Sequence, residues 1–368
     1  MSLIIEYREA VQDDIDALVD LEERCFDGDR LSRRQFRWML AKAHAELVLA
    51  TLSGSDTIVG YIIILFHRST ALARLYSIAV LPEYRQFGVA RTLISQGEET
   101  ALKYDRYYMR LEVRNDNEAA IRLYTRLGYH QFGMYDDYYE DHAPALRFEK
   151  RLLQEPRSPH RVVAHYAQTS GFTCGPAALM MAMNALDPAF EMSRKLEFQL
   201  WREATTIFMT SGHGGCSGHG LAMAAWRRGF GVELYVNTSD VPFEHSVRDE
   251  DKRTVLKLVH EDFLDQMQST DITLHVRDWD VADLRDVLDE GGLVLVLISS
   301  YRLNSTKVPH WMLLVAMDEN LAYLHDPEVD WDSHKSAFDC TYVPVLIADF
   351  KRMTRWGKNA LRMAIAIS

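Results

Sequence analysis

The side chain with the clearest potential for covalent chemistry is Cys174. It is followed by Gly175-Pro176 and an alanine-rich apolar run, a pattern that predicts a helix whose first turn accommodates the proline. A helix N-terminus favours the thiolate form of a cysteine, because the helix dipole stabilises negative charge there. Six residues upstream, Gln168 carries an amide that can fold back and donate a hydrogen bond to an oxyanion beside the sulfur.

A thiolate nucleophile also needs a histidine and a group that orients the histidine. His310 stands at the head of one apolar strand pattern, and Asp326 follows the end of the next one. Two adjacent strands would bring these side chains within hydrogen-bond reach, so we predict a catalytic set of Cys174, His310, Asp326 and Gln168. The competing interpretation is that free cysteines are mostly buried and inert. It is the one we adopt for the other three cysteines, and we expect His325 to be a core or surface residue.

A second stretch with chemical potential follows a strand pattern that ends at Val80. The motif Arg-x-x-Gly-x-Ala comes next, and a helix pattern begins after it. Consecutive backbone N–H groups at such a helix start, with small residues that permit close approach, form an anion site suited to a pyrophosphate. The residues predicted to bind the cofactor there are Arg85, Gln86, Phe87, Gly88, Val89 and Ala90.

With the Arg-Leu-Glu-Val-Arg strand at 110–114 and the Asn-Glu-Ala-Ala-Ile-Arg-Leu-Tyr helix at 117–124, this motif resembles the GNAT superfamily of acyl-CoA-dependent N-acyltransferases. Within that superfamily it resembles the branch that acetylates the N-terminal alanine of ribosomal proteins. The resemblance covers residues 4–153 and implies acetyl-CoA as the cofactor and a peptide or protein as the acceptor. It also implies that backbone groups of Ile78 and Val80 contact the thioester and the pantetheine arm.

The resemblance assigns roles to three more residues. Glu112 matches the base that takes a proton from the acceptor ammonium, whereas the alternative is a solvated strand carboxylate paired with Arg110 or Arg114. Tyr124 matches the acid that protonates the departing thiolate, whereas the alternative is a core aromatic in an apolar helix stripe. Asn117 can cap the helix, hydrogen-bond the cofactor arm, or do both.

In the second half of the chain, the order cysteine, histidine, aspartate resembles the papain-like cysteine peptidases. The helix start at Cys174, the glutamine before it and the Asp-Pro pair at 326–327 most resemble the peptidases that process bacteriocins after a double glycine. This resemblance covers about residues 160–350. Those peptidases are usually fused to membrane transporters, and no run in this sequence has the apolar length of a membrane span. Double-glycine specificity is therefore not carried over.

Two further stretches are open to more than one interpretation. Residues 134–141 resemble the loop that closes over a peptide N-terminus in the ribosomal-protein branch, and they would equally suit an aromatic surface hairpin. Residues 211–220 include His213, Cys216 and His219, three residues of zinc-ligand type. No fourth ligand is evident, so we expect a wall of the substrate cleft or a plain loop rather than a metal site.

The elements that must position these residues fall into two groups. Alternating strands and helices over 1–153 predict an α/β GNAT domain with a mixed sheet flanked by helices. A polar segment with two prolines, 154–160, predicts a linker. Over 161–368, helices followed by strands predict an α+β papain-like domain with a largely antiparallel sheet. The predicted strands are 4–7, 46–52, 58–66, 72–80, 108–113, 146–152, 293–298, 311–316, 321–325 and 343–348, and the predicted helices are 13–25, 89–104, 118–127, 177–185, 221–228, 255–267 and 281–289.

Composition agrees with two soluble domains. The 368 residues are 48% hydrophobic and 26% charged, which is too apolar for a disordered chain. The net charge of −12 is shared, with 20 Lys+Arg against 24 Asp+Glu in 1–153 and 21 against 29 in 154–368. Neither half has the basic excess of a binder of nucleic acid or of anionic membranes. Four cysteines without a CxxC pair, and a start without a signal-peptide pattern, predict a reduced, cytoplasmic protein.

These patterns together predict a bifunctional enzyme that N-acetylates an amine from acetyl-CoA and hydrolyses a peptide bond with a Cys-His-Asp triad. Two alternatives remain open for the second half: a deamidase or transpeptidase, or a non-catalytic peptide-binding module that serves the acetyltransferase. Because cleavage creates a new α-amine, a substrate shared by the two halves is a further hypothesis.

Overall fold

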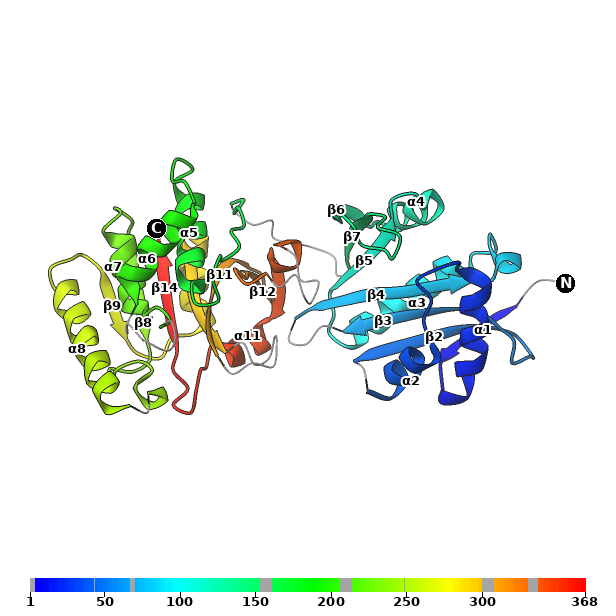
Figure 1. The fold of residues 1–368 in the computed structure, drawn as a ribbon, viewed down its shortest axis with the longest axis horizontal. Coiled ribbons are helices and arrows are strands. Elements are labelled where there is room, and N and C mark those ends of the chain that lie inside the picture. Colours follow the sequence, from blue (N-terminus) through cyan, green and yellow to red (C-terminus); the bar gives the residue numbers. More distant parts are fainter. Residues whose placement is uncertain are drawn as a thin grey trace. The chain divides into compact units, whose positions relative to one another are not determined.

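In the computed structural model, the described residues are 4–42, 44–66, 70–152, 161–205, 214–247, 249–299, 308–329 and 337–368. The chain divides into two units, Met1–Glu155 (unit 1) and Pro156–Ser368 (unit 2). Figure 1 colours unit 1 from blue to cyan and unit 2 from green to red. The segment 154–160, predicted to be a linker, lies outside the described residues.

Unit 1 is built on one mixed sheet, with the strand order β1-β2-β3-β4-β5-β7-β6 among the described residues. Neighbouring strands are antiparallel except β4 and β5, which are parallel. The strands are β1 (Ile5–Glu9), β2 (Ala45–Leu52), β3 (Ile58–Phe66), β4 (Leu72–Val80), β5 (Tyr108–Arg114), β6 (His130–Tyr135) and β7 (Ala145–Arg151). The helices are α1 (Ile15–Cys25), α2 (Arg33–Lys42), α3 (Val89–Lys103) and α4 (Glu118–Arg126).

Alternation along the strands supplies two apolar faces for these helices. Because side chains of a strand point to opposite faces in turn, Ile62 and Ile64 of β3 pack with α3, whereas Tyr61 and Ile63 pack with α1 and α2. Each face buries its own core of aliphatic and aromatic side chains. The sheet is therefore covered on both sides, as the sequence predicted.

The parallel pair of unit 1 opens part-way along its length. Strands β4 and β5 are paired only from Leu72↔Tyr108 to Leu75↔Leu111, although β4 continues to Val80. The register of β4 against β3 also shifts just beyond Leu75, which is the mark of a β-bulge. Figure 1 shows β5, β7 and β6 with α4 turning away from β2–β4. Among the residues that the structure describes, the last ones of β4 thus have no strand partner on the β5 side.

Unit 2 has a largely antiparallel sheet in the order β13-β12-β11-β10-β14-β8-β9, again among the described residues. Only β8 and β9 pair in parallel. The strands are β8 (Val232–Val236), β9 (Thr273–Val276), β10 (Leu293–Ser299), β11 (Pro309–Met317), β12 (Leu321–His325), β13 (Val343–Leu346) and β14 (Met363–Ile367). The helices are α5 (Cys174–Leu186), α6 (Arg194–Ala204), α7 (Gly218–Trp226), α8 (Glu250–Met267), α9 (Val281–Asp289) and α11 (Ile347–Met353).

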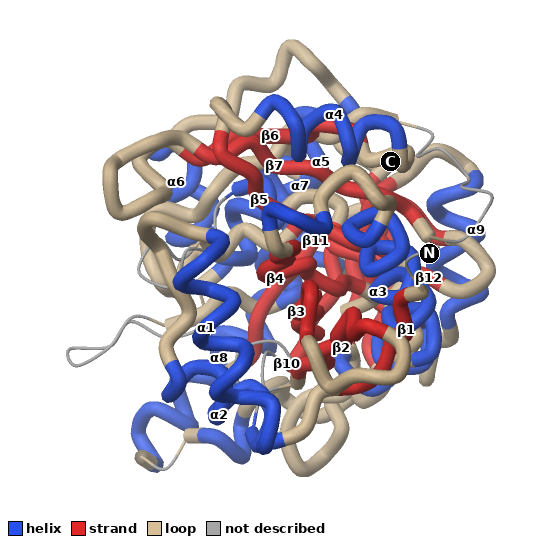
Figure 2. Tube along the Cα trace, turned by 90° about the vertical axis from the view of Figure 1, so that its right-hand side faces the viewer, coloured by secondary structure: helices blue, strands red, loops and turns tan. Residues whose placement is uncertain are grey.

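Helix α5 is the central helix of unit 2. Nearly all of its side chains are buried, and it contacts β10 and β11 as well as α6 and α7. A helix that is apolar on all sides belongs inside a domain. Figure 2 shows the helices in blue and the strands in red.

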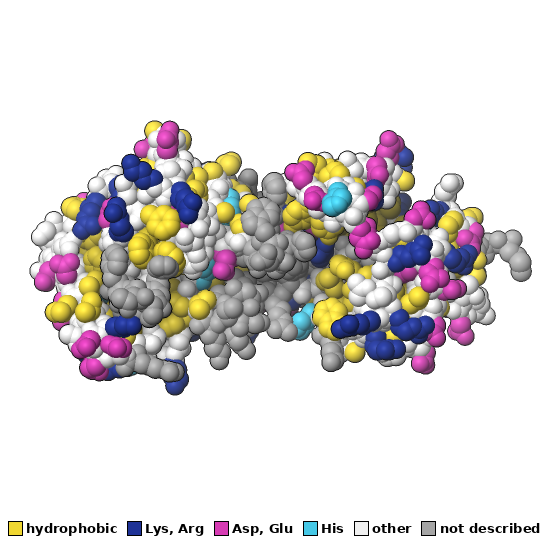
Figure 3. All heavy atoms as spheres, viewed as in Figure 1, with side chains coloured by type: hydrophobic (Ala, Val, Ile, Leu, Met, Phe, Trp, Pro, Cys, Tyr) yellow, Lys and Arg dark blue, Asp and Glu magenta, His cyan; other side chains and the backbone are white. Residues whose placement is uncertain are grey.

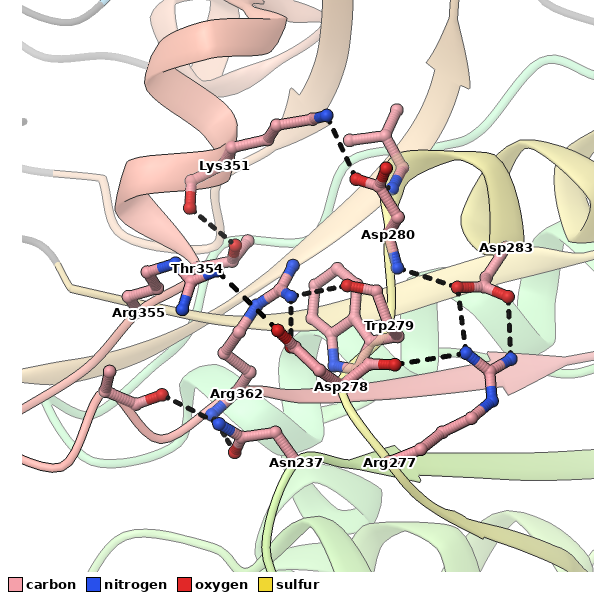
Figure 4. Close-up of polar contacts among 12 residues, drawn as sticks. Asn237, Arg277, Asp278, Trp279, Asp280, Asp283, Lys351, Thr354, Arg355 and Arg362 are labelled. Atoms are coloured by element: carbon pink, nitrogen blue, oxygen red, sulfur yellow. Dashed lines mark hydrogen bonds and ion pairs between the residues drawn. The ribbon is translucent and has the colours of Figure 1, made fainter.

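Strand β14 lies in the middle of this sheet and is secured at its start by a polar cluster (Figure 4). The Arg362 guanidinium contacts the Asp278 carboxylate and lies 3.8 Å from the centre of the Trp279 ring. Its backbone N–H donates to Asn237 Oδ1 at 2.8 Å, and the Asn237 amide donates to Ala360 O at 3.0 Å. The loop after β9 and the end of β8 thereby hold the entry to β14.

Several elements differ from the sequence prediction. The predicted strand 343–348 ends at Leu346, because α11 begins at Ile347. The elements that the sequence patterns did not indicate are α2, α6, α11, β6, β8, β9 and β14. Most are short, and β14 (Met-Ala-Ile-Ala-Ile) is an apolar run whose length is ambiguous between strand and helix.

Charged side chains of both signs are interspersed on the face of each unit that Figure 3 shows. Among the described helices, none combines the length and the apolar character needed to cross a membrane.

Candidate active sites

Cys174 is the first residue of α5, as predicted, and it is half-buried. A Cβ atom on Gly175 would lie 2.9 Å from a Leu221 methyl carbon and 3.2 Å from the Trp311 ring, so a larger residue would make these side chains of α7 and β11 shift. Thr173 is the N-cap residue, but its side chain makes no capping bond to the helix. The positive end of α5 therefore meets Cys174 without a side-chain cap.

His310 and Asp326 come together as predicted. His310 is the second residue of β11 and Asp326 directly follows β12, its antiparallel neighbour. His310 Nε2 lies 2.7 Å from Asp326 Oδ1, and both side chains are buried. The same Oδ1 accepts a hydrogen bond from the Glu328 backbone N–H at 2.9 Å, which fixes the carboxylate.

Electrostatics link this pair to Cys174. Burial by itself would lower the pKa of His310, but the Asp326 carboxylate and then the Cys174 sulfur raise that pKa well above 6.5. Since Nε2 is held by Asp326, Nδ1 is the ring nitrogen left for the sulfur. The His310 imidazole thus stands between the Cys174 sulfur and the Asp326 carboxylate, which is the arrangement that thiol chemistry requires.

Gln168 lies beside the end of this triad. Its backbone N–H donates to Pro327 O at 2.8 Å, which ties it to the residue after Asp326. Its side-chain Oε1 is buried and has no hydrogen-bond partner among the described residues. The amide of Gln168 is thus not used to hold the fold.

Glu197 on α6 was not predicted from the sequence. Its side chain is fully buried, and its oxygens accept from Tyr166, Thr169 and Thr173, all in the segment that leads to Cys174. No local signal identifies it, because α6 was not predicted and the partners lie 24 to 31 residues away.

The glycine-rich segment 211–220 is described from residue 214 onward, so His213 lies outside the described residues. Cys216 is buried, and its carbonyl accepts a hydrogen bond from Trp311 Nε1 at 3.3 Å. The His219 ring packs edge-on against that of His260 at 4.7 Å, and burial followed by His260 lowers the pKa of His219 to about 3. Within the described residues, no group of three or more His, Cys, Asp or Glu is placed to hold a metal ion.

His325 is fully buried in the core of unit 2 rather than exposed on its surface. Its ring packs edge-on against Tyr342 at 4.5 Å and lies 6.0 Å from the His165 ring. Burial and then His165 lower its pKa to about 3. The neighbouring His165 Nε2 lies 2.7 Å from Asp326 O, so His165 is the histidine that contacts the backbone at Asp326.

In unit 1, the predicted anion loop has the backbone form that such a site needs. Gln86 and Gly88 both have positive φ, 70° and 81°, and Gly88 is the N-cap of α3. Successive N–H groups in such a turn point toward a common centre. Nothing lies within 4 Å of a Cβ built on Gly88, which leaves the helix start open. Arg85 Nε donates to Val80 O at 3.1 Å and so joins the loop to the end of β4.

The other residues predicted to bind the cofactor lie around the same end of β4. Phe87 is exposed, Val89 is buried at the start of α3, and Ala90 packs against the core beside it. Ile78 and Val80 lie on the part of β4 that has left β5. Among the described residues, no strand pairs with this part of β4 on the β5 side, and Val80 O accepts from Arg85 Nε.

Glu112 is held between two guanidinium groups. Arg74 Nε donates to its Oε2 at 2.7 Å, and Arg147 Nε lies 3.5 Å from its Oε1. The sequence-based alternative of pairing with Arg110 or Arg114 is wrong, because those two pair with other acids (Glu149, Asp116 and Asp141). The carboxylate is nearly buried, with 7% of its side chain exposed.

Tyr124 is a core aromatic of α4, 5% exposed, and burial raises its pKa. It packs with Tyr129 and Phe148 at ring distances of 5.8 and 6.5 Å. Asn117 caps α4 by accepting from Ala120 N at 3.1 Å. The core position of Tyr124 is the alternative that the sequence offered beside its predicted acid role, and the helix cap is one of the two roles foreseen for Asn117.

The tyrosine-rich stretch 134–141 covers the Glu112 side of the sheet. Tyr135 and Tyr138 stack at 5.4 Å, and the Tyr138 hydroxyl accepts from Arg74 at 2.5 Å. Burial first, and then the neighbouring Tyr138 and Glu112, raise the pKa of Tyr139. Arg74 contacts both Glu112 and Tyr138, so aromatic side chains of this stretch lie close to the candidate base.

Comparison with protein families agrees with this geometry. The model of the Peptidase_C39 like family matches residues 163–368, more than half of the sequence. The chain belongs to the Peptidase_C39 like family. The model of the Acetyltransferase (GNAT) family matches residues 15–129, so unit 1 is a GNAT acetyltransferase domain in front of the C39-like domain.

Individual relatives match part of this C39-like protein. An acetyltransferase of Pectobacterium atrosepticum is 30% identical over 136 residues, which cover 34% of this chain and 87% of the relative. N-alpha-acetyltransferase 20 of Dictyostelium discoideum is 38% identical over 80 residues, or 22% of this chain and 46% of the relative. The chain thus spans less than half the length of that relative, and 34% of an uncharacterized protein of Mycobacterium leprae.

Among solved structures, the ribosomal-protein-S18-alanine N-acetyltransferase from Escherichia coli is similar, with a TM-score of 0.38 and 23% identity. The match covers 42% of this chain and 98% of that one.

Proposed function

We propose that unit 2 is a cysteine peptidase and that unit 1 transfers an acetyl group from acetyl-CoA to the amine of a peptide or protein N-terminus. The observation that carries the first part is the buried pair of His310 Nε2 and Asp326 Oδ1, 2.7 Å apart, in the unit where Cys174 opens α5. In keeping with this geometry, Asp326 and then Cys174 raise the pKa of His310. A raised imidazole pKa favours the imidazolium, and an imidazolium beside a helix-terminal sulfur favours the thiolate.

Each step of hydrolysis has a residue in place. The Cys174 thiolate attacks the peptide carbonyl, and the oxyanion that forms is met by the Gln168 amide. The His310 imidazolium gives its proton to the leaving amine, which releases the first product and leaves a thioester on Cys174. Neutral His310 then takes a proton from water as that water attacks the thioester. The carbon–sulfur bond breaks, the acid product leaves, and the Cys174 thiolate is restored beside the His310 imidazolium. Asp326 holds the ring and balances its charge throughout.

For unit 1, the residues present fit a pyrophosphate-bearing cofactor. The positive-φ residues Gln86 and Gly88, the open helix start and the freed end of β4 supply N–H groups without side-chain obstruction. Acetyl-CoA supplies an activated acetyl thioester. We assign its phosphates to the loop 85–90 and its arm to the backbone of Ile78 and Val80, with Asn117 nearby.

The chain's own groups manage the protons of that transfer. Glu112 takes the proton of the acceptor ammonium, so that the amine is a free nucleophile. Arg74 and Arg147 fix the carboxylate in place from both sides. Tyr124 would act as the acid, with its hydroxyl as the proton source for the sulfur of the departing thiol.

Alkylation of Cys174 tests the peptidase half without knowledge of the substrate. Intact-mass analysis after brief iodoacetamide treatment between pH 5 and 9 should show fast single-site labelling near pH 6. The labelling should vanish in Cys174→Ala and slow in His310→Ala. Cys25→Ala is the matched control, because Cys25 is also half-buried but stands in unit 1. Labelling of Cys174 only at high pH, no faster than a free thiol, would contradict the thiolate–imidazolium pair.

A shared substrate for the two units is a separate proposal. The amine released by cleavage would be acetylated by unit 1 at the high local concentration that a covalent connection provides. Acetylation of the cleaved product should be faster for the whole chain than for a mixture of Cys174→Ala and Glu112→Gln chains. Equal rates for the two would argue against coupling.

A further inference from the structure

The carboxylate of Glu197 collects four donor groups on its two oxygens. Oε1 accepts from the Thr169 backbone N–H at 2.8 Å and from the Thr173 hydroxyl at 2.5 Å. Oε2 accepts from the Tyr166 hydroxyl at 3.0 Å and from the Thr169 hydroxyl at 2.8 Å. An ionised carboxylate offers about four acceptor sites and no donor, so this set of partners matches it.

All four donor groups belong to residues 166–173, a short segment that contains the proposed oxyanion donor and ends beside the proposed nucleophile. Thr169 follows Gln168, the residue proposed to meet the oxyanion, and Thr173 precedes Cys174, the proposed nucleophile. Glu197 itself is on α6 and has no exposed surface. It is therefore a single buried anchor for the backbone between the nucleophile and the oxyanion donor.

The segment has a few further contacts, among them the packing of the Phe172 ring against Phe198 and Trp201 of α6 at 6.2 and 5.1 Å. Gln168 is tied to Pro327 O through its backbone, and Thr173 N–H donates to Ser170 O at 3.2 Å. The Gln168 side chain contributes nothing that holds it, since its Oε1 has no partner among the described residues. Thr173 is the N-cap of α5, but its hydroxyl makes no bond to the helix. Glu197 Oε1 at 2.5 Å and Ser170 O at 2.8 Å both lie within reach of its single proton, which can be donated to only one of them at a time. The Thr173 hydroxyl thus lies against Glu197 and does not cap the first turn of α5.

We infer that Glu197 is a positioning residue, which sets the place of Gln168 relative to Cys174. This inference rests on the proposed thiol chemistry of unit 2. Glu197→Gln is the natural probe, because it keeps the size of the side chain but turns one oxygen into a donor. Two of the four donors would then face an N–H group, and the segment would shift.

Two reagents separate the oxyanion donor from the nucleophile. p-Nitrophenyl acetate acylates a thiolate through an oxyanion and releases p-nitrophenolate, whereas iodoacetamide alkylates the same sulfur by displacing iodide at carbon, with no oxyanion. In Gln168→Ala we expect acylation of Cys174 to slow about tenfold or more, and alkylation near pH 6 to change less than about twofold. Glu197→Gln should give the same pattern.

The double variant decides whether Glu197 acts through Gln168. If it does, Glu197→Gln slows acylation little further once Gln168→Ala is present. Glu203→Gln is the matched control on α6, because its carboxylate pairs with Arg228 outside this segment, and it should change neither rate. If Glu197→Gln fails to fold, Thr169→Val removes only one hydroxyl contact and should give a weaker effect of the same kind.

Equal slowing of acylation and alkylation in Glu197→Gln would overturn the inference, since it would indicate general damage to the site. Full additivity in the double variant, or no effect at all, would overturn it too. A wild-type chain that neither reagent modifies quickly at Cys174 would instead refute the proposed peptidase and the inference with it.

Discussion

Each unit buries a carboxylate at its candidate reaction centre, but the two carboxylates have different partners. Glu112 of unit 1 contacts the guanidiniums of Arg74 and Arg147, whereas Asp326 of unit 2 contacts the imidazole of His310. Guanidinium groups keep their charge at any physiological pH, while an imidazole gains and loses a proton. The charges beside Glu112 therefore do not change with pH, whereas the His310 imidazole beside Asp326 can pass a proton to and from the Cys174 sulfur.

Of substitutions at the two carboxylates, the one in unit 2 has the largest expected effect. Asp326→Asn keeps the shape but cannot balance the His310 imidazolium, so thiol-dependent hydrolysis should fall by roughly 10³- to 10⁴-fold. The rate is measured with a cleavable peptide selected from a library. Acetyl transfer by unit 1 in the same preparation is the control and should be unchanged. Hydrolysis at the wild-type rate would show that His310 does not need this carboxylate.

A change of charge at Glu112 should act on stability as well as on rate. Glu112→Gln removes the anion between two largely buried guanidiniums, which we expect to cost unit 1 about 2 to 3 kcal/mol, because a buried charge then lacks its partner. Hydrogen exchange of unit 1 peptides in urea, followed by mass spectrometry, measures the loss.

Glu118→Gln provides the matched control for that measurement. Glu118 is exposed and forms an i,i+4 pair with Arg122 on α4, so its loss should cost no more than about 0.5 kcal/mol. Similar losses in the two variants would mean that the buried pair contributes no more than a surface pair.

The pH dependence of stability sharpens the comparison within unit 2. His219 and His325 have folded pKa values of about 3, below the unfolded value near 6.5. The unfolded chain therefore binds protons that the folded chain refuses, and stability falls as the pH drops from about 6.5 toward 3. The slope should approach about 1.4 kcal/mol per pH unit for each histidine.

His310 behaves in the opposite sense, because its folded pKa is raised. Its contribution to stability is fully present below about pH 6.5 and is lost as the pH rises through the raised folded value. Urea unfolding of unit 2 at pH 5, 6 and 7 tests the acid side. The slope should flatten in His219→Gln, and an unchanged slope in that variant would contradict the assignment to the buried histidines.

The smallest expected effect concerns Tyr138, whose hydroxyl contacts Arg74 beside Glu112. Tyr138→Phe removes the hydroxyl that accepts from Arg74 and should cost unit 1 about 1 kcal/mol. Tyr7→Phe is the control, because no described residue hydrogen-bonds the Tyr7 hydroxyl. Hydrogen exchange around Arg74 is the readout, and equal protection in both variants would show that the contact adds no stability.

The contrast also explains what the sequence could predict. The pairing of His310 with Asp326 could be predicted, because the start of one antiparallel strand lies beside the end of the next. The partners of Glu112 do not, because Arg74 and Arg147 come from strands 38 and 35 residues away, and local spacing pointed instead to Arg110 and Arg114. Glu197 was missed for the same reason: its role exists only once α6 packs beside the segment before Cys174.

Local backbone rules were the more reliable part of the prediction. The helix starts at Cys174 and near Gly88 are set by neighbours in sequence, and both were predicted within three residues. Elements that depend on their surroundings, such as β14 and α11, were not.

The place of β14 in unit 2 has a consequence for synthesis. Residues 363–367 separate β10 from β8, so the two halves of this sheet cannot join until those residues have left the ribosome. The sheet of unit 1 is complete by Arg151, more than two hundred residues earlier. Unit 1 can therefore fold while unit 2 still exposes the apolar strands β10 and β11, and nascent chains should be most open to aggregation and to chaperones in that interval.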